Sequence, residues 1–107
     1  MGLNKGYKTP DEYIGTNPTF GDPSSVTIGN TSTLAIAANT NRKYLVISND
    51  STEDMYISFG SAAVINKGLR LNANGGTLEW FGPNVFGSAV YAITASGSKR
   101  MTYQEAA

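Results

Sequence analysis

The sequence contains no cysteine and no histidine. Without cysteine the chain has no disulfide framework, no thiolate nucleophile and no zinc site of the cysteine type. Without histidine it lacks the commonest general base and the commonest zinc ligand, and it forms neither a Ser-His-Asp nor a Cys-His triad. We therefore predict a protein that is not an enzyme and that uses no cofactor and no metal.

Charge is also scarce, at 15% of the residues against about 25% in an average soluble domain. Eight basic and eight acidic residues balance to a formal net charge of zero. The basic pairs Arg42-Lys43 and Lys99-Arg100 fit strand starts, where charge keeps a sheet edge soluble. A nucleic-acid surface needs a basic face that neutralises several phosphates. No run approaches the ~18 apolar residues of a membrane helix, so we predict neither a nucleic-acid nor a membrane partner.

The acidic residues leave two alternatives open. A hydrolase needs no more than two carboxylates, and Asp54 and Glu79 are the candidates. A calcium site is the second alternative, because Asp50, Glu53 and Asp54 bring oxygen ligands to one loop. Their spacing does not match the EF-hand, and three acids fall short of six or more oxygens. Solvated surface acids are the favoured interpretation of all four residues.

The first 24 residues differ in composition from the rest. They hold three of the four prolines, and their apolar residues follow neither the period of a strand nor that of a helix. Disordered tails are poor in aromatic residues, whereas this segment carries three. We predict an extended N-terminal arm over residues 1–24 that docks on a partner. Its predicted contact residues are Tyr7, Tyr13, Ile14 and Phe20.

From residue 25 onward, short β-type runs alternate with turn residues. The predicted strands cover 25–28, 33–37, 43–48, 55–59, 68–71, 77–81, 89–94 and 100–104. The strongest turn signal is Asn74-Gly75-Gly76, which tolerates positive φ; a phosphate loop is disfavoured because a strand, not a helix, follows. About seven or eight short strands with regular turns are typical of a sandwich or barrel. We predict an all-β fold over residues 25–107: one small antiparallel β-sandwich, jelly-roll-like, preceded by the arm.

The alternation within each run predicts which side chains face the core. The predicted core residues are Val26, Ile28, Leu34, Ile36, Leu45, Ile47, Ile57, Phe59, Leu71, Leu78, Trp80, Ile93 and Met101. In the third run Tyr44 and Val46 are also apolar, which fits either a central strand or a face buried against a partner chain. Tyr56, Phe81 and Tyr91 are predicted to point outward, and aromatic residues are enriched at interfaces. We predict these three as the partner-binding residues of the domain surface.

Three segments, 41–51, 55–60 and 68–76 (NRKYLVISNDS, MYISFG and GLRLNANGG), resemble the small β proteins encoded among the virion genes of tailed bacteriophages. The resemblance extends over about residues 25–105. It implies a head decoration or cement protein: a β-sandwich with an extended arm that sits on the capsid as a dimer or trimer. Its implied partner is the major capsid protein or another virion protein, and its implied location is the virion, after synthesis in the bacterial host cytoplasm.

A second function remains open from the sequence. A carbohydrate- or receptor-binding module of a phage tail or fibre would present Trp80, Phe81 or Tyr91 as an exposed platform. Against that role, a lone tryptophan in a sandwich is more often a core residue. We therefore expect a capsid-stabilising virion protein, with the tail or fibre module as the alternative.

Overall fold

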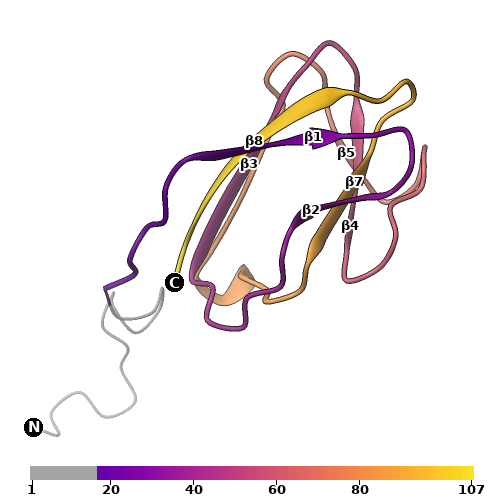
Figure 1. Ribbon diagram of the computed structural model, residues 1–107. Coiled ribbons are helices and arrows are strands. Elements are labelled where there is room, and N and C mark those ends of the chain that lie inside the picture. Colours follow the sequence, from indigo (N-terminus) through magenta and orange to yellow (C-terminus); the bar gives the residue numbers. More distant parts are fainter. Residues whose placement is uncertain (1–16) are drawn as a thin grey trace, which may run out of the picture.

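The computed structural model describes residues 17–107, which form eight β-strands and one short 3-10 helix (Figure 1). The elements are β1 (Ser24–Ile28), β2 (Thr33–Ile36), β3 (Tyr44–Asp50), β4 (Met55–Phe59), β5 (Leu69–Leu71), β6 (Thr77–Phe81), η2 (Gly82–Asn84), β7 (Val90–Ile93) and β8 (Lys99–Ala106). The predicted all-β fold is confirmed, and each predicted strand has a counterpart.

The strands form two four-stranded antiparallel sheets that pack face to face. The first sheet has the order β1-β8-β3-β6 and the second the order β2-β7-β4-β5. The pairs β1·β8, β2·β7, β3·β6 and β4·β5 are those of one long hairpin rolled into a sandwich. Eight strands wound in two sheets in this way make a jelly roll. The structure therefore decides between a sandwich and an open barrel in favour of the sandwich.

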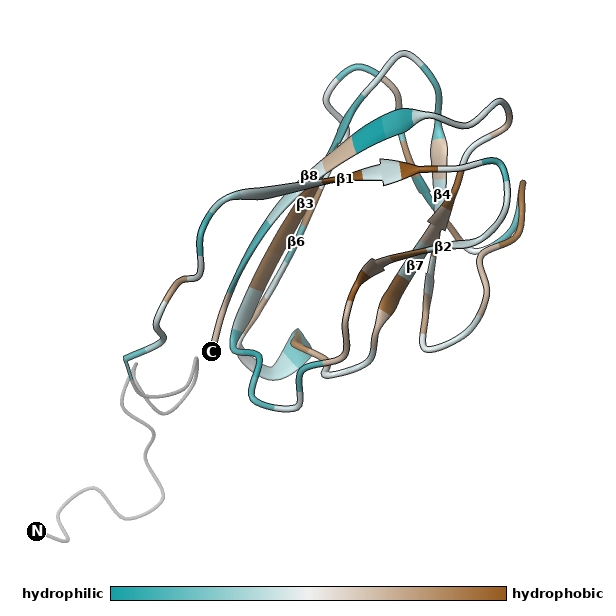
Figure 2. Ribbon diagram, viewed as in Figure 1, coloured by the Kyte–Doolittle hydropathy of each residue, from teal (hydrophilic) through white to brown (hydrophobic). Residues whose placement is uncertain are grey.

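Apolar residues lie along β2, β3 and β7, whereas the start of β8 and several turns are hydrophilic (Figure 2). Strand β3 shows the alternation of burial along a strand. Leu45 and Ile47 are buried, whereas their neighbours Tyr44, Val46 and Ser48 are half-buried. Successive side chains of a strand point to opposite faces, so β3 turns one face to the core and the other outward. Strand β3 lies between β8 and β6, so the predicted alternative of a central strand is confirmed by its position, whereas a face buried against a partner chain stays a prediction.

Most of the predicted core is confirmed. Eight of the predicted residues are buried, namely Ile28, Ile36, Leu45, Ile47, Ile57, Leu71, Ile93 and Met101. Three more, Val26, Leu78 and Trp80, are half-buried and pack against the core. The prediction omitted Met55, Val90 and Ala92, which are fully buried.

Leu34 and Phe59 were predicted in the core and are exposed, at 51% and 38%. In β2 the register shifts between Leu34 and Ile36. Such a bulge breaks the alternation of side chains, so Leu34 turns to the outer face while Ile36 stays inside. Phe59 lies opposite buried Val90 and keeps the inward orientation, but it is the last residue of β4 and sits at the open rim of the sandwich.

The turn between β5 and β6 has the predicted backbone. Asn74 and Gly75 have φ angles of 63° and 99°, the left-handed region that asparagine and glycine tolerate best. Gly76 donates its N–H to the carbonyl oxygen of Asn72 at 3.1 Å. The segment that follows is strand β6, so the phosphate-loop alternative is wrong.

Candidate binding surfaces

The described end of the arm joins the first sheet before β1 begins. Thr19 and Ala107 exchange two backbone hydrogen bonds of 2.8 and 3.0 Å, and Gly21 donates to the carbonyl oxygen of Glu105 at 2.9 Å. Phe20 forms an isolated bridge with Ala106. The first described residues of the chain therefore lie beside its C-terminus (Figure 1), as an extension of the ladder along β8.

This arrangement creates an apolar groove of about 270 Å³ on the outer face of the first sheet. We call it the aromatic groove; it is lined by Pro18, Phe20, Lys43, Tyr44 and Phe81. The rings of Phe20 and Phe81 are 52% and 54% exposed. Two residues predicted separately as partner contacts, one from the arm and one from the domain surface, thus lie in one site.

The floor of the aromatic groove is set by a small residue. Ala106 lies opposite both Phe20 and Tyr44. It is two positions from outward Gln104 and therefore on the same face of β8, so its methyl group faces the groove. The rings of Phe20 and Tyr44 lean across it to a centroid distance of 5.4 Å. Ala106 is consequently 1% exposed although it lies on the outer face.

Tyr44 is held in place by its hydroxyl group, which donates a hydrogen bond to the carboxylate of Glu79 on the neighbouring strand β6. This hydrogen bond is the main reason that the pKa of Tyr44 is raised above its usual value, with smaller contributions from burial and from the charge of Glu79. The bond fixes the ring that separates Phe20 from Phe81.

A buried arginine anchors the end of the sandwich that carries the aromatic groove. The side chain of Arg42 has no exposed surface and pairs with Glu105 at 2.9 Å. Its other nitrogen atoms donate to the carbonyl oxygens of Ala37, Phe86 and Ser88 at 2.9, 2.9 and 3.0 Å. The guanidinium also lies over the Phe86 ring, 5.3 Å from its centroid. The prediction of a solvated charge at a strand start is therefore wrong for Arg42, which ties two loops to β8.

A second apolar surface lies on the outer face of the second sheet. Leu34, 51% exposed, lies opposite Tyr91, and Tyr91 lies opposite Ser58. Tyr56 occupies the next outward position of β4, between Ile93 and Arg70. We call Leu34, Tyr56 and Tyr91 the second-sheet patch; Tyr56 and Tyr91 are half-buried.

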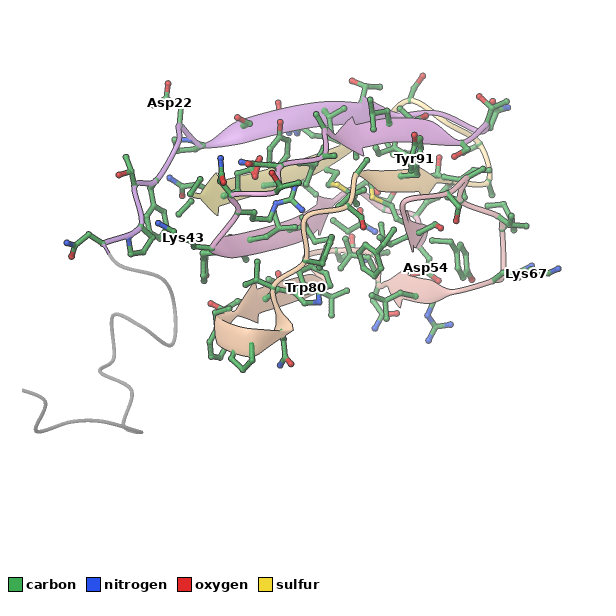
Figure 3. All side chains as sticks on the ribbon, turned by 90° about the horizontal axis from the view of Figure 1, so that it is seen from below. Asp22, Lys43, Asp54, Lys67, Trp80 and Tyr91 are labelled. Atoms are coloured by element: carbon green, nitrogen blue, oxygen red, sulfur yellow. The ribbon has the colours of Figure 1, made fainter. Side chains whose placement is uncertain are left out.

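The labelled side chains of Figure 3 show how far apart these regions are. Lys43 of the aromatic groove lies near the described start of the chain, whereas Tyr91 lies toward the other end of the molecule. Trp80 points into the sandwich, where it packs edge-on against Phe59 and Phe86 at centroid distances of 5.5 and 5.3 Å. Its contacts are those of a core residue, so it does not offer an exposed platform.

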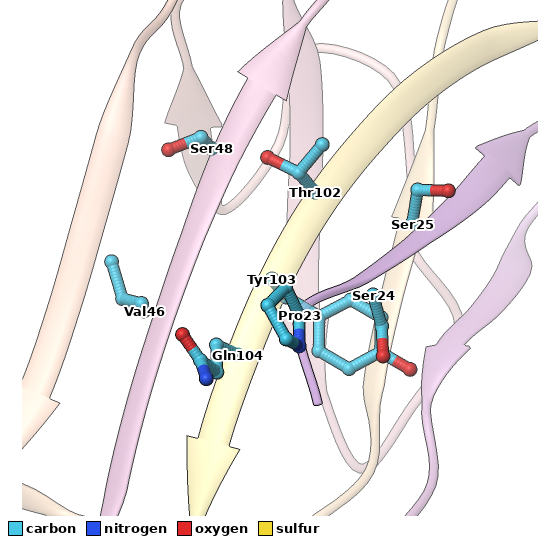
Figure 4. Close-up of a pocket in the computed structure, with 8 residues that line it drawn as sticks. All are labelled: Pro23, Ser24, Ser25, Val46, Ser48, Thr102, Tyr103 and Gln104. Carbon is cyan, nitrogen blue, oxygen red and sulfur yellow. The ribbon is translucent and has the colours of Figure 1, made fainter. Parts of the chain in front are cut away.

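The first sheet also carries a shallow trough of about 430 Å³ across β1, β8 and β3 (Figure 4). Its lining is rich in hydroxyl and amide groups, from Pro23, Ser24, Ser25, Val46, Ser48, Thr102, Tyr103 and Gln104. Ser25, Thr102, Ser48 and Thr77 lie opposite one another in one row across the four strands. The trough thus mixes polar and apolar surface, whereas the aromatic groove is almost entirely apolar.

Each candidate carboxylate already has a partner of its own. Asp50 pairs with Arg100 at 2.8 Å, and Asp54 accepts a hydrogen bond from the backbone N–H of Ala73. Glu53 accepts hydrogen bonds from Ser96, whose hydroxyl and N–H lower the pKa of this carboxyl below its usual value.

Among residues 17–107, no three acidic side chains come close enough to hold a metal ion, so Asp50, Glu53 and Asp54 do not form the predicted ligand set. For the hydrolase alternative, Asp54 and Glu79 belong to different sheets, at the start of β4 and in β6. The four candidate acids instead make contacts within loops and between strands.

The structure brings Phe20 and Phe81 together and places Tyr56 and Tyr91 on the opposite sheet. Tyr7, Tyr13 and Ile14 lie outside the described residues. The sequence analysis missed Pro18, Tyr44 and Leu34 as surface residues. The apolar outward face of β3 was a signal for Tyr44, whereas nothing in the sequence indicated the bulge that exposes Leu34.

No family model, curated protein or solved structure matches the chain. The resemblance to phage virion proteins therefore stays a prediction. In the described part of the chain, no helix has the length and apolar character needed to cross a membrane.

Proposed function

We propose that this chain is a non-enzymatic structural protein of a tailed-phage virion, a decoration or cement protein that binds across capsid subunits and stabilises the shell. The observation that carries the proposal is the pair of apolar surfaces on opposite faces, the aromatic groove and the second-sheet patch. A protein that joins neighbours needs at least two separate contact surfaces. Stacked sheets lie about 10 Å apart, so one small contact does not cover both.

The fold and the composition support the same function. Jelly rolls are common in viral capsid and lectin domains, although a fold by itself leaves the function open. With 15% charged residues and zero net charge, the chain has little means of binding through long-range electrostatics. Contacts made by apolar and hydroxyl groups are screened little by salt, so we expect attachment to be nearly salt-independent.

We assign the second-sheet patch to the capsid subunit. Burial of apolar area contributes roughly 25 cal/mol per Å² before the entropy of association is counted. A patch of three side chains gives a weak single contact. Many copies on a symmetric shell, linked to one another as a dimer or trimer, gain strength through multivalency.

The test uses particles of the phage that encodes the chain, washed at about 0.05 M and at about 0.5 M salt. Between these two concentrations the screening of exposed charges increases strongly. We expect the chain at a copy number comparable to that of the major capsid protein in both washes. Particles that lack the chain should release their DNA at a lower temperature, and added purified chain should restore the wild-type value. Washed particles without the chain, or an add-back without effect, contradict the proposal.

The trough favours one second candidate, a carbohydrate-binding module of a tail or fibre. Its short hydroxyl and amide side chains offer hydrogen bonds to the hydroxyl groups of a sugar. This function predicts few copies per particle rather than a full set. Because Trp80 is turned inward, the readout is a glycan-dependent shift of the NMR signals of Thr102 and Gln104, and unshifted signals across a glycan panel contradict it.

A further inference from the structure

We propose that the aromatic groove of one copy binds residues 11–14 of the N-terminal segment of a second copy. Tyr13 and Ile14 would fill the groove, and Asp11 and Glu12 would lie at its Lys43 end. The proposal deepens the proposed function by naming the self-contact. Its test needs the purified chain alone, so its failure is distinguishable from a failure of capsid attachment.

The size and chemistry of the groove suit a short apolar segment of a peptide. At about 270 Å³ it lies just below the ~300–1,000 Å³ typical of sites for small molecules. Phe20 and Phe81 leave about half of their surface exposed, and Pro18 and Tyr44 complete an apolar wall. Such a groove suits one or two apolar side chains of a peptide.

The N-terminal segment of the chain begins beside the groove and has a composition that matches it. Sixteen residues precede Asn17, and fully extended they reach up to about 50 Å. Tyr13 and Ile14 form an adjacent apolar pair, with the acidic pair Asp11-Glu12 directly before it. The groove offers aromatic rings and one cation, Lys43, which is the complementary pattern.

The charges around the groove also give the bound segment a direction. The acidic neighbour of the groove is Glu79, which lies two positions before Phe81 along β6 and accepts a hydrogen bond from the hydroxyl group of Tyr44. Like charges close together repel. The acidic pair of the arm therefore belongs at the Lys43 end, away from Glu79.

The geometry at Pro18 favours a second copy over the same chain as the source of the bound segment. Read toward the N-terminus, the described chain pairs with Ala107 at Thr19 and bends at Asn17, which has a φ of 50°. Pro18 itself lines the groove, and only residues 15–17 separate it from Ile14. To fill the groove of its own chain, this short segment would have to close a tight hairpin against Pro18, whereas the groove of a neighbouring copy sets no such limit.

The test is a complementation experiment with full-length variants. Phe81→Ala removes the groove ring, and Tyr13→Ser combined with Ile14→Ser removes the arm anchors. By sedimentation equilibrium we expect the wild type to self-associate, and each variant alone to raise the dissociation constant at least about tenfold, as for an interface anchor. An equal mixture should recover heterodimers, because the intact arm of one variant meets the intact groove of the other.

Val64→Ala is the matched control, since it removes an apolar side chain of similar exposure, 48%, from the loop after β4 and should leave association unchanged. A wild type that stays monomeric overturns the proposal. Equal weakening by Val64→Ala overturns it in favour of nonspecific hydrophobic association. Two variants that destabilise the monomer without restoring association on mixing show that the arm binds its own groove, which also overturns it.

Discussion

At the scale of single residues, Arg42 is the clearest case of a side chain whose role depends on the fold. In the sequence it is half of a basic pair, a pattern typical of a solvated strand start. In the structure it donates to three backbone carbonyl oxygens and pairs with Glu105. Those partners lie five to 63 positions from Arg42 in the sequence. No local pattern could have revealed them.

We expect Arg42→Met to lower the free energy of unfolding by about 3 kcal/mol, because it leaves a carboxylate and three carbonyl groups without their buried partner. Arg100→Ala is the control: its ion pair with Asp50 is more than half exposed, and such pairs contribute less than about 1 kcal/mol. Urea unfolding measures both. Equal effects of the two substitutions would show that Arg42 is not an anchor.

The carboxyl group of Glu53 makes the stability of the fold depend on pH. Hydrogen bonds from Ser96 lower the folded-state pKa of this carboxyl, so its stabilising contribution is complete above the unfolded value of about 4.3 and is lost as the pH falls through the folded value. The urea midpoint of the wild type should therefore exceed that of Glu53→Gln by a constant amount above about pH 5. The difference should shrink below about pH 4. A difference that persists unchanged to about pH 3 would contradict this role.

At the scale of elements, alternation and turn chemistry predicted the strands well because each strand has one buried face. The failures lie where the period of two is interrupted or a strand ends. The bulge in β2 reverses the direction of Leu34 relative to Ile36, and a bulge leaves little trace in a short apolar run. The aromatic groove was half predictable: Phe20 and Phe81 were named separately, but their meeting depends on the pairing of residues 19–21 with β8.

The turn between β5 and β6 offers a paired test. A Cβ at Gly76 would lie 2.4 Å from the carbonyl oxygen of Asn72 and 2.6 Å from its nitrogen, whereas a Cβ at Gly75 meets no atom within 4 Å. Gly75→Ala should cost about 1 kcal/mol for its positive φ. Gly76→Ala should cost clearly more, since backbone atoms must move. Thermal unfolding ranks the two, and the reverse order would contradict the turn geometry.

At the scale of the whole molecule, we propose one sandwich with binding surfaces on both outer faces. Leu34→Ser should reduce the amount of the protein retained on particles. It should leave the thermal midpoint nearly unchanged, because half of the Leu34 side chain is already exposed. Val64→Ser is the matched control, at 48% exposure in the loop after β4. Co-sedimentation with particles measures retention, and equal retention of the two variants would remove the second-sheet patch from the contact.

A cryo-electron microscopy map of the washed particles tests the central claim most directly. We expect density for the jelly roll on the shell surface, with Leu34, Tyr56 and Tyr91 against the capsid subunits and the aromatic groove facing a neighbouring copy. A shell without this density, or one in which the second-sheet patch faces solvent on every copy, would contradict the account.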